Sequence, residues 1–130
     1  MTYEDRELVL KDLGGRLPYG VKILDIAANV VGKLFLISTT DTVKYVQYET
    51  VDDSGEQSLY CIKPYLFPLS SMTYEQEREY NFLRDLVPTD EDFELVDNWR
   101  SIDYLNANHF DYRGLIENGL AIDATGLGIY

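Results

Sequence analysis

The fold is decided by residues 21–63, VKILDIAANVVGKLFLISTTDTVKYVQYETVDDSGEQSLYCIK. This stretch holds four runs rich in β-branched and aromatic residues, and turn-forming residues separate them. Asn29 suits a tight turn because asparagine tolerates a positive φ, and DDSG is the strongest turn signal in the chain. The pattern therefore predicts four successive strands, at residues 21–26, 30–37, 42–48 and 58–63.

The connections between these strands are short, so neighbouring strands are expected to pair antiparallel. The second strand is apolar on both faces, with Phe35 on one and Leu34 on the other. A sheet with one wet face would alternate more cleanly. We therefore expect a curled antiparallel sheet of four or five strands, in the form of a small SH3-like barrel, with Gly32 supplying a bend. An ordinary twisted sheet with helices on one side is the alternative.

Three or four short helices are expected to flank the sheet, which gives an α+β fold. A first helix begins after the N-cap residue Thr2 and ends at Gly14-Gly15. A second begins at the capping box Thr73-Tyr-Glu-Gln76 and runs to about residue 86, before Val87-Pro88. A third runs from Asp97 or Ser101 to Asn108.

The remaining segments are expected to be extended or turned. Pro64 and Pro68 argue against a central strand, so residues 63–73 are expected to lie across the edge of the sheet. Residues 89–96 are expected to form an acidic loop. Asp111 can cap a short helical turn over residues 112–118. A last strand is expected at residues 120–124, and the apolar tail is expected to dock.

Length and composition limit the class of protein. A chain of 130 residues predicts a single domain, 1–130, and 45% apolar residues are typical of a globular protein. No apolar run reaches the roughly 20 residues of a membrane span. A single cysteine, Cys61, and an acidic N-terminus favour a reducing, cytoplasmic location, which the resemblance described below would place in a host bacterial cell. Cys61 is expected to be a buried hydrophobe. No cofactor is expected, and one histidine with one cysteine makes a zinc site improbable.

Negative charge is concentrated in one part of the chain. The net charge is −12, and residues 73–98 hold nine acidic residues and two arginines, a net charge of −7. This distribution argues against direct nucleic-acid binding and permits a basic protein partner. The candidate binding surface is acidic, and its residues are Glu75, Glu77, Glu79, Asp90, Glu91, Asp92 and Glu94.

A second candidate site lies in the sequence His109-Phe-Asp111-Tyr112-Arg113. Asp111 could orient His109 as a general base, and Arg113 could hold an anion. In the competing interpretation, Asp111 caps a helix and Arg113 pairs with a nearby acid. The acidic residues 90–94 lack the spacing of a calcium-binding EF-hand loop.

Three stretches resemble motifs in a group of small proteins encoded by phages and prophages of gut bacteria. They are RLPYGVK (16–22), KPYLFPLSSMT (63–73) and HFDYRGLIENGLAI (109–122). The resemblance covers about a quarter of the chain and implies a mobile-element context. It implies no activity, because that group has none assigned.

Three functional hypotheses follow. The first is a non-catalytic phage-type protein whose acidic surface engages a basic host or phage protein. The second is a small-molecule or nucleotide-binding protein, conceivably an enzyme, with its site around His109–Arg113. The third is a structural or assembly component, in which some of the eleven tyrosines form an interface between copies.

Overall fold

The computed structural model describes residues 2–40, 44–85 and 93–130, with backbone alone for residues 85 and 93–99. Three α-helices and seven strands follow one another in the described residues, together with three short 3-10 helices, labelled η. In chain order they are α1 (Tyr3–Arg16), η1 (Leu17–Tyr19), β1 (Lys22–Asp25), β2 (Val30–Thr39), β3 (Lys44–Glu49), β4 (Ser54–Ser58), η2 (Leu59–Cys61), β5 (Ile62–Pro68), η3 (Leu69–Ser71), α2 (Tyr74–Asp85), α3 (Phe93–Ala107), β6 (Phe110–Asp111) and β7 (Ile122–Asp123).

The α+β class is confirmed, but the sheet is mixed and has more strands than expected. Its strand order is β4-β3-β2-β1-β5-β6, and β7 also pairs with β5. The ladders among β1 to β5 are antiparallel, whereas β6 and β7 run parallel to β5. The path through the described strands is open at β4 and β6, so the expected small barrel is not confirmed.

The position of β5 corrects the expectation that its prolines keep residues 63–73 out of the sheet. The first half of β5 pairs with β1, where Pro64 lies opposite Ile23. The second half pairs with β6 and β7, and Pro68 is its last residue. Because each half of β5 needs a different partner, the missing proline N–H groups do not break a continuous ladder.

The prediction of a single fourth strand over residues 58–63 is also wrong. β4 ends at Ser58, whose hydroxyl accepts a hydrogen bond from the Tyr60 N–H and begins η2. β5 then begins at Ile62. β4 has the sequence SGEQS and was missed because it contains no large apolar residue. Its pairing with β3, and not its own propensity, makes it a strand.

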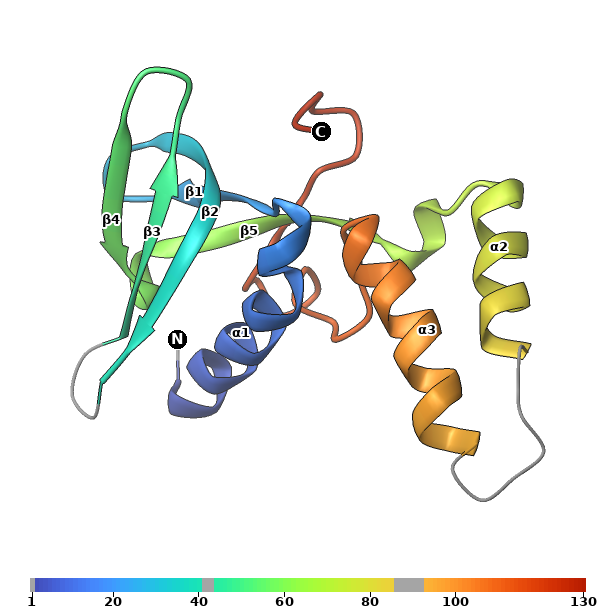
Figure 1. Cartoon of the computed structure of the whole chain (residues 1–130). Helices are drawn as coiled ribbons and strands as arrows, with labels where there is room; N and C mark the ends of the chain where they lie inside the picture. The colour runs from blue at the N-terminus through green and yellow to red at the C-terminus, as the bar shows by residue number, and fades with distance from the viewer. Residues whose placement is uncertain (1, 41–43, 86–92) are drawn as a thin grey trace.

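The core lies between α1 and the sheet. Val9 and Leu13 of α1 are fully buried, as are Ile23 and Leu34 of the sheet. Figure 1 shows α1 lying across the curled part of the sheet formed by β1, β2 and β5. The same cluster includes apolar residues from β3, β5 and the last segments of the chain: Val46, Tyr48, Ile62, Leu66, Leu115 and Leu120.

The first helix does not end at Gly14-Gly15 but continues through both glycines to Arg16. Its start is the expected one, because Thr2 and Asp5 form a capping box. The Asp12 and Arg16 side chains bond to each other one turn apart, across the two glycines. This contact and the fit of α1 on the sheet outweigh the weak helix propensity of glycine.

The exposed position of Gly14 within α1 gives a testable prediction. Gly14→Ala is expected to raise the free energy of unfolding by about 0.5–1 kcal/mol, because alanine restricts the unfolded chain. A Cβ there meets nothing within 4 Å. Urea unfolding measures the change. Gly119→Ala is the control and is expected to lower the free energy of unfolding. A Cβ at Gly119 also meets nothing within 4 Å, but its φ of +73° is unfavourable for alanine. A loss of stability in Gly14→Ala would contradict the helical assignment.

The second helix begins as expected, and the third begins earlier. The Thr73 N–H donates to Gln76 Oε1 at 2.9 Å, and the Gln76 N–H donates to Thr73 Oγ1 at 3.1 Å. Residues 93–96 belong to α3 and not to an acidic loop, while 89–92 lie outside the described residues. Residues 112–118 form turns instead of a helix, and the last strand shortens to β7.

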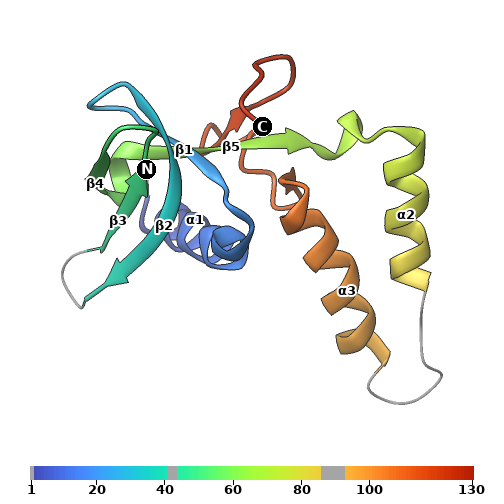
Figure 2. The ribbon, with the colours of Figure 1, turned by 45° about the horizontal axis from the view of Figure 1, so that its top comes forward.

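The helix α2 stands apart from the sheet, whereas α3 contacts α1 and β6. α2 packs on α3, and both views show α3 between α2 and the rest of the molecule (Figures 1 and 2). β5 runs from the curled sheet towards α2, so η3 and the start of α2 lie at its far end. Within the described ranges, no helix has the length and apolar character needed to cross a membrane.

Candidate functional site

The acidic residues of α2 lie on the surface. Glu75, Glu77 and Glu79 are all exposed. Glu79 is close enough to α3 that, after burial, its charge is the second cause of the raised pKa of Tyr104. Asp90, Glu91 and Asp92 lie outside the described residues, and Glu94 belongs to α3 with only its backbone described. The structure therefore places three of the seven predicted acidic side chains, and these three share one short helix.

Aromatic side chains lie among these acids. Tyr74 is 78% exposed and Phe82 is 59% exposed. Phe82 lines a surface hollow of about 430 Å³ with Glu75, Arg78 and Glu79. These four positions follow the i, i+3, i+4, i+7 spacing of one helix face. The face thus combines an exposed aromatic ring with two carboxylates and one guanidinium group.

The four residues of the His109–Arg113 cluster do not meet in one pocket. Asp111 is buried, and its carboxylate accepts backbone N–H bonds from Arg113, Leu115 and Ile116 at 2.9–3.1 Å. It therefore holds the turn that follows it and is not bonded to His109. Asp111 therefore caps the backbone that follows it, as expected, although this segment forms turns and not a helix.

Arg113 and Tyr112 belong to a second network, centred on α1. Arg16 and Asp12 are both fully buried and form two hydrogen bonds, at 2.7 and 3.1 Å. Arg16 also donates to the Phe110 carbonyl oxygen at 2.6 Å. Arg113 pairs with Asp12 at 3.2 Å, and its guanidinium lies over the Tyr112 ring. This network ties α1 to β6 and the turn after it, which is a structural task.

His109 is in an unusual environment. Its φ is +63°, a left-handed conformation that few non-glycine residues adopt. Its ring stacks on Tyr130, with 3.8 Å between centroids and 12° between planes. Burial, together with the positive charges of Arg16 and Lys22, lowers the pKa of His109 to about 4. The imidazole is therefore neutral at neutral pH, and its buried Nδ1 has no hydrogen-bond partner among the described residues.

His109 opens into a cavity of about 470 Å³. Sequence reasoning singled out His109 but missed the other residues of this cavity, which come from β5, η3, α2, the segment from the end of α3 to β6, the turn after β7 and the tail. They are Phe67, Ser71, Gln76, Ala107, Asn108, Phe110, Thr125, Gly126 and Tyr130. Only the apolar tail gave a signal, and Tyr130 does dock: its hydroxyl donates to the Tyr65 carbonyl oxygen at 2.8 Å.

The lowered pKa of His109 makes stability depend on pH. The unfolded chain binds a proton near pH 6.5, whereas the folded chain does so only near pH 4. The free energy of unfolding is therefore expected to fall as the pH is lowered from about 6.5 towards 4. Urea unfolding in steps between pH 7 and pH 5 measures this slope.

His109→Asn is the matched variant, because asparagine accepts a positive φ and does not titrate. The variant is expected to lose most of the slope between pH 6.5 and 5, since His109 is the only histidine. An unchanged slope in this variant would show that other groups cause it and that His109 is solvated.

A further buried acid, Asp25, was not singled out from the sequence. Its carboxylate accepts hydrogen bonds from Tyr48 Oη at 2.6 Å, from Gln57 Nε2 at 3.1 Å and from the Ala28 N–H at 3.1 Å. Burial opposes its ionisation, but these bonds together hold the pKa of Asp25 below its usual value. The bond to Asp25 is the main reason why the pKa of Tyr48 rises to about 12. Asp25 therefore joins β1 to β3 and β4.

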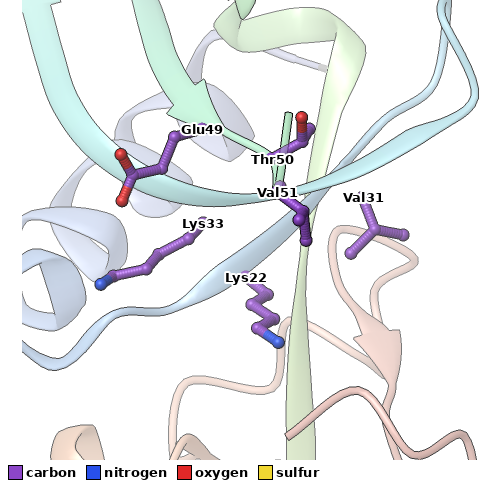
Figure 3. Close-up of a pocket in the computed structure, with 7 residues that line it drawn as sticks. Lys22, Val31, Lys33, Glu49, Thr50 and Val51 are labelled. Atoms are coloured by element: carbon purple, nitrogen blue, oxygen red, sulfur yellow. The ribbon is translucent and has the colours of Figure 1, made fainter. Parts of the chain in front are cut away.

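A shallower pocket of about 280 Å³ lies on the outer side of the sheet. Figure 3 shows Lys33 and Glu49 on one side of this pocket and Val31 on the other, with Val51 between them. Lys22 and Lys33 are cross-strand neighbours, and Glu49 lies opposite Lys33 on the next strand. Lys22 already donates to the Ile129 carbonyl oxygen at 2.8 Å. Glu49 therefore offsets one of the two lysine charges in the lining of this pocket.

In the part of the chain that the structure describes, no three histidine, cysteine, aspartate or glutamate side chains gather as a metal site requires. Cys61 is half-buried. Comparison with family models, curated proteins and solved structures gives no match. The functional conclusion therefore rests on the geometry of α2 and of the His109 cavity.

Proposed function

We propose that this protein is a non-catalytic binding protein that engages a basic surface of another protein through the exposed face of α2. The observation that carries the proposal is the position of Glu75, Glu77 and Glu79 on the helix farthest from the sheet (Figure 1). Among the described residues, α2 packs mainly against α3, and the side chains of Glu75, Glu77 and Glu79 are exposed.

Charge supports the choice of a basic partner. The chain carries −12 overall, and −7 of this lies in residues 73–98. A concentrated negative field attracts a positive surface and speeds association. The same field repels phosphate backbones, which argues against nucleic acid as the partner.

The exposed rings of α2 support a protein partner over simple solubility. A helix needed only for solubility has no use for Tyr74 and Phe82 at 78% and 59% exposure. Aromatic residues are enriched among the side chains that carry most of the energy of an interface, and the rim around them is polar. The face of α2 has this composition.

The test is affinity capture from a bacterial lysate, the source that the resemblance to phage proteins indicates. The wild type is compared with the triple variant Glu75→Lys, Glu77→Lys and Glu79→Lys. We expect basic proteins to be captured at low salt, to be lost at high salt, and to be reduced at least tenfold by the variant. Exposed charge pairs are screened over roughly 8–10 Å at physiological ionic strength, which explains the salt effect.

Two controls make the result specific. The variant Asp52→Lys, Glu56→Lys and Glu117→Lys makes the same change in charge at exposed sites away from α2 and is expected to capture normally. A second α2 variant replaces the same three glutamates by glutamine. It removes the negative charges without placing positive charges near the N-terminus of α2, where they would destabilise the helix. Equal capture by the wild type and both α2 variants would overturn the proposal.

A further inference from the structure

The cavity beside His109 is built from six separate parts of the chain and has the size of a small-ligand site. Its volume is about 470 Å³, within the range of ligand pockets. Aromatic rings form part of the lining: Phe67 packs against Phe110 at 6.3 Å and against Tyr130 at 5.7 Å between centroids. Tyr130 is held by two hydrogen bonds, because its hydroxyl also accepts from the Lys22 N–H at 2.9 Å. The rings are therefore fixed in place.

We propose that this cavity binds the base of a nucleoside, a neutral nitrogen heterocycle, independently of the protein-binding face of α2. Two amide side chains carry the argument. Gln76 Oε1 accepts from the Thr73 N–H, so the Nε2 group remains as a donor. Asn108 Nδ2 donates to the Tyr104 carbonyl oxygen, so Oδ1 remains as an acceptor. One donor and one acceptor match the edge of a nucleobase.

The aromatic lining favours a flat ligand. Bases bind to proteins by stacking on aromatic side chains, and this contact tolerates any base because each has a π-face. His109 and Tyr130 already form one stacked pair at the cavity. A planar ring can extend such a stack, whereas a ligand without a flat face gains nothing from it.

The charges around the cavity favour a nucleoside over a nucleotide. No lining side chain within the described ranges carries a formal charge at neutral pH, since His109 is neutral. The two cations whose charges act on His109 are Arg16, which is fully buried and paired with Asp12, and Lys22, whose ammonium group donates to the Ile129 carbonyl oxygen. Neither is a lining residue, so a phosphate group would find no cationic side chain to pair with in the described lining.

The backbone conformation of His109 also supports a ligand site here. A non-glycine residue at a φ of +63° costs energy, and such residues cluster at ligand sites. The buried Nδ1 of His109 lacks a hydrogen-bond partner, which is an exception in folded proteins. The stacking contact with Tyr130 holds the His109 ring in place, although the backbone of His109 is strained there.

The experiment is isothermal titration of the full chain with adenosine, guanosine, cytidine and uridine. At least one nucleoside is expected to bind, and its 5′-monophosphate is expected to bind more weakly. Glucose, which is neutral but not planar, is expected not to bind. Affinity is expected to stay constant between pH 8 and pH 5, because His109 remains neutral there.

Gln76→Glu is the decisive variant, because glutamate preserves the capping box with Thr73 but removes the amide donor. It is expected to weaken binding at least tenfold, as is His109→Asn. Glu117→Gln, the reverse replacement at an exposed position outside both α2 and the cavity, is the control and is expected to bind normally. No binding of any nucleoside at millimolar concentration, equal binding of glucose, or full binding by a folded Gln76→Glu would overturn the proposal. Protein capture by α2 is a separate readout, so each proposal can fail alone.

Discussion

Asp12→Ala is expected to lower the free energy of unfolding by about 3–5 kcal/mol, the usual cost of leaving a buried charge without its partner. Asp12 and Arg16 are both fully buried, and Asp12 also forms an ion pair with Arg113. Without the carboxylate, the Arg16 guanidinium would keep only its bond to the Phe110 carbonyl oxygen. Because domains are stable by about 5–15 kcal/mol, this one change removes a large fraction of the total.

Urea unfolding measures the loss, and two further variants interpret it. Lys11→Ala removes an exposed charge from the same helix and is expected to change stability by less than about 0.5 kcal/mol. The double variant Asp12→Leu with Arg16→Met removes both charges and is expected to recover most of the loss. A loss below about 1 kcal/mol in Asp12→Ala would show that water reaches Arg16.

Gly32→Ala is expected to destabilise the protein by about 2–3 kcal/mol, the upper part of the usual cost of overpacking. A Cβ at Gly32 would press on the Tyr48 ring, 3.0 Å from Cγ and closer to Cδ2, and would lie 3.2 Å from the Glu49 carbonyl oxygen. Gly55 lies against the other end of the ring, where a Cβ would be 2.5 Å from Cζ. The ring cannot move aside easily, because its hydroxyl is bonded to Asp25.

A double-mutant cycle identifies the cause. Gly32→Ala made in a Tyr48→Ala background is expected to cost at least about 1 kcal/mol less than in the wild type, since the ring that it strikes is absent. Thermal or urea unfolding of the four proteins gives the coupling energy. Equal costs in both backgrounds would show that Gly32 is needed for its backbone and not for the close approach of Tyr48.

Local signals in the sequence predicted the elements that depend on local contacts. The capping boxes at Thr2 and Thr73 locate the starts of α1 and α2, because both partners of each box lie within four residues. The strands over residues 21–48 were recognised from their apolar runs, with residues 41–43 outside the described part. Gly14-Gly15 failed as a stop signal, since a long-range fit holds α1 helical.

Elements that depend on distant partners could not be predicted. β4 is a strand through its pairing with β3, and β5 tolerates Pro64 and Pro68 because it changes partners along its length. The same limit applies to the sites. His109 was singled out as the only histidine, but Gln76 and Tyr130 come to it from distant parts of the chain. The exposed acids of α2 were recognised because the helix pattern fixes its outer face.

Carbodiimide crosslinking of a captured complex tests the central claim most directly, because this reagent joins a carboxylate to an amine only where the two are in contact. The account predicts links from Glu75, Glu77 or Glu79 to lysines of the partner, identified by peptide mass spectrometry. Links confined to the exposed carboxylates of β3 and β4, such as Glu49 and Glu56, with none from α2, would contradict it.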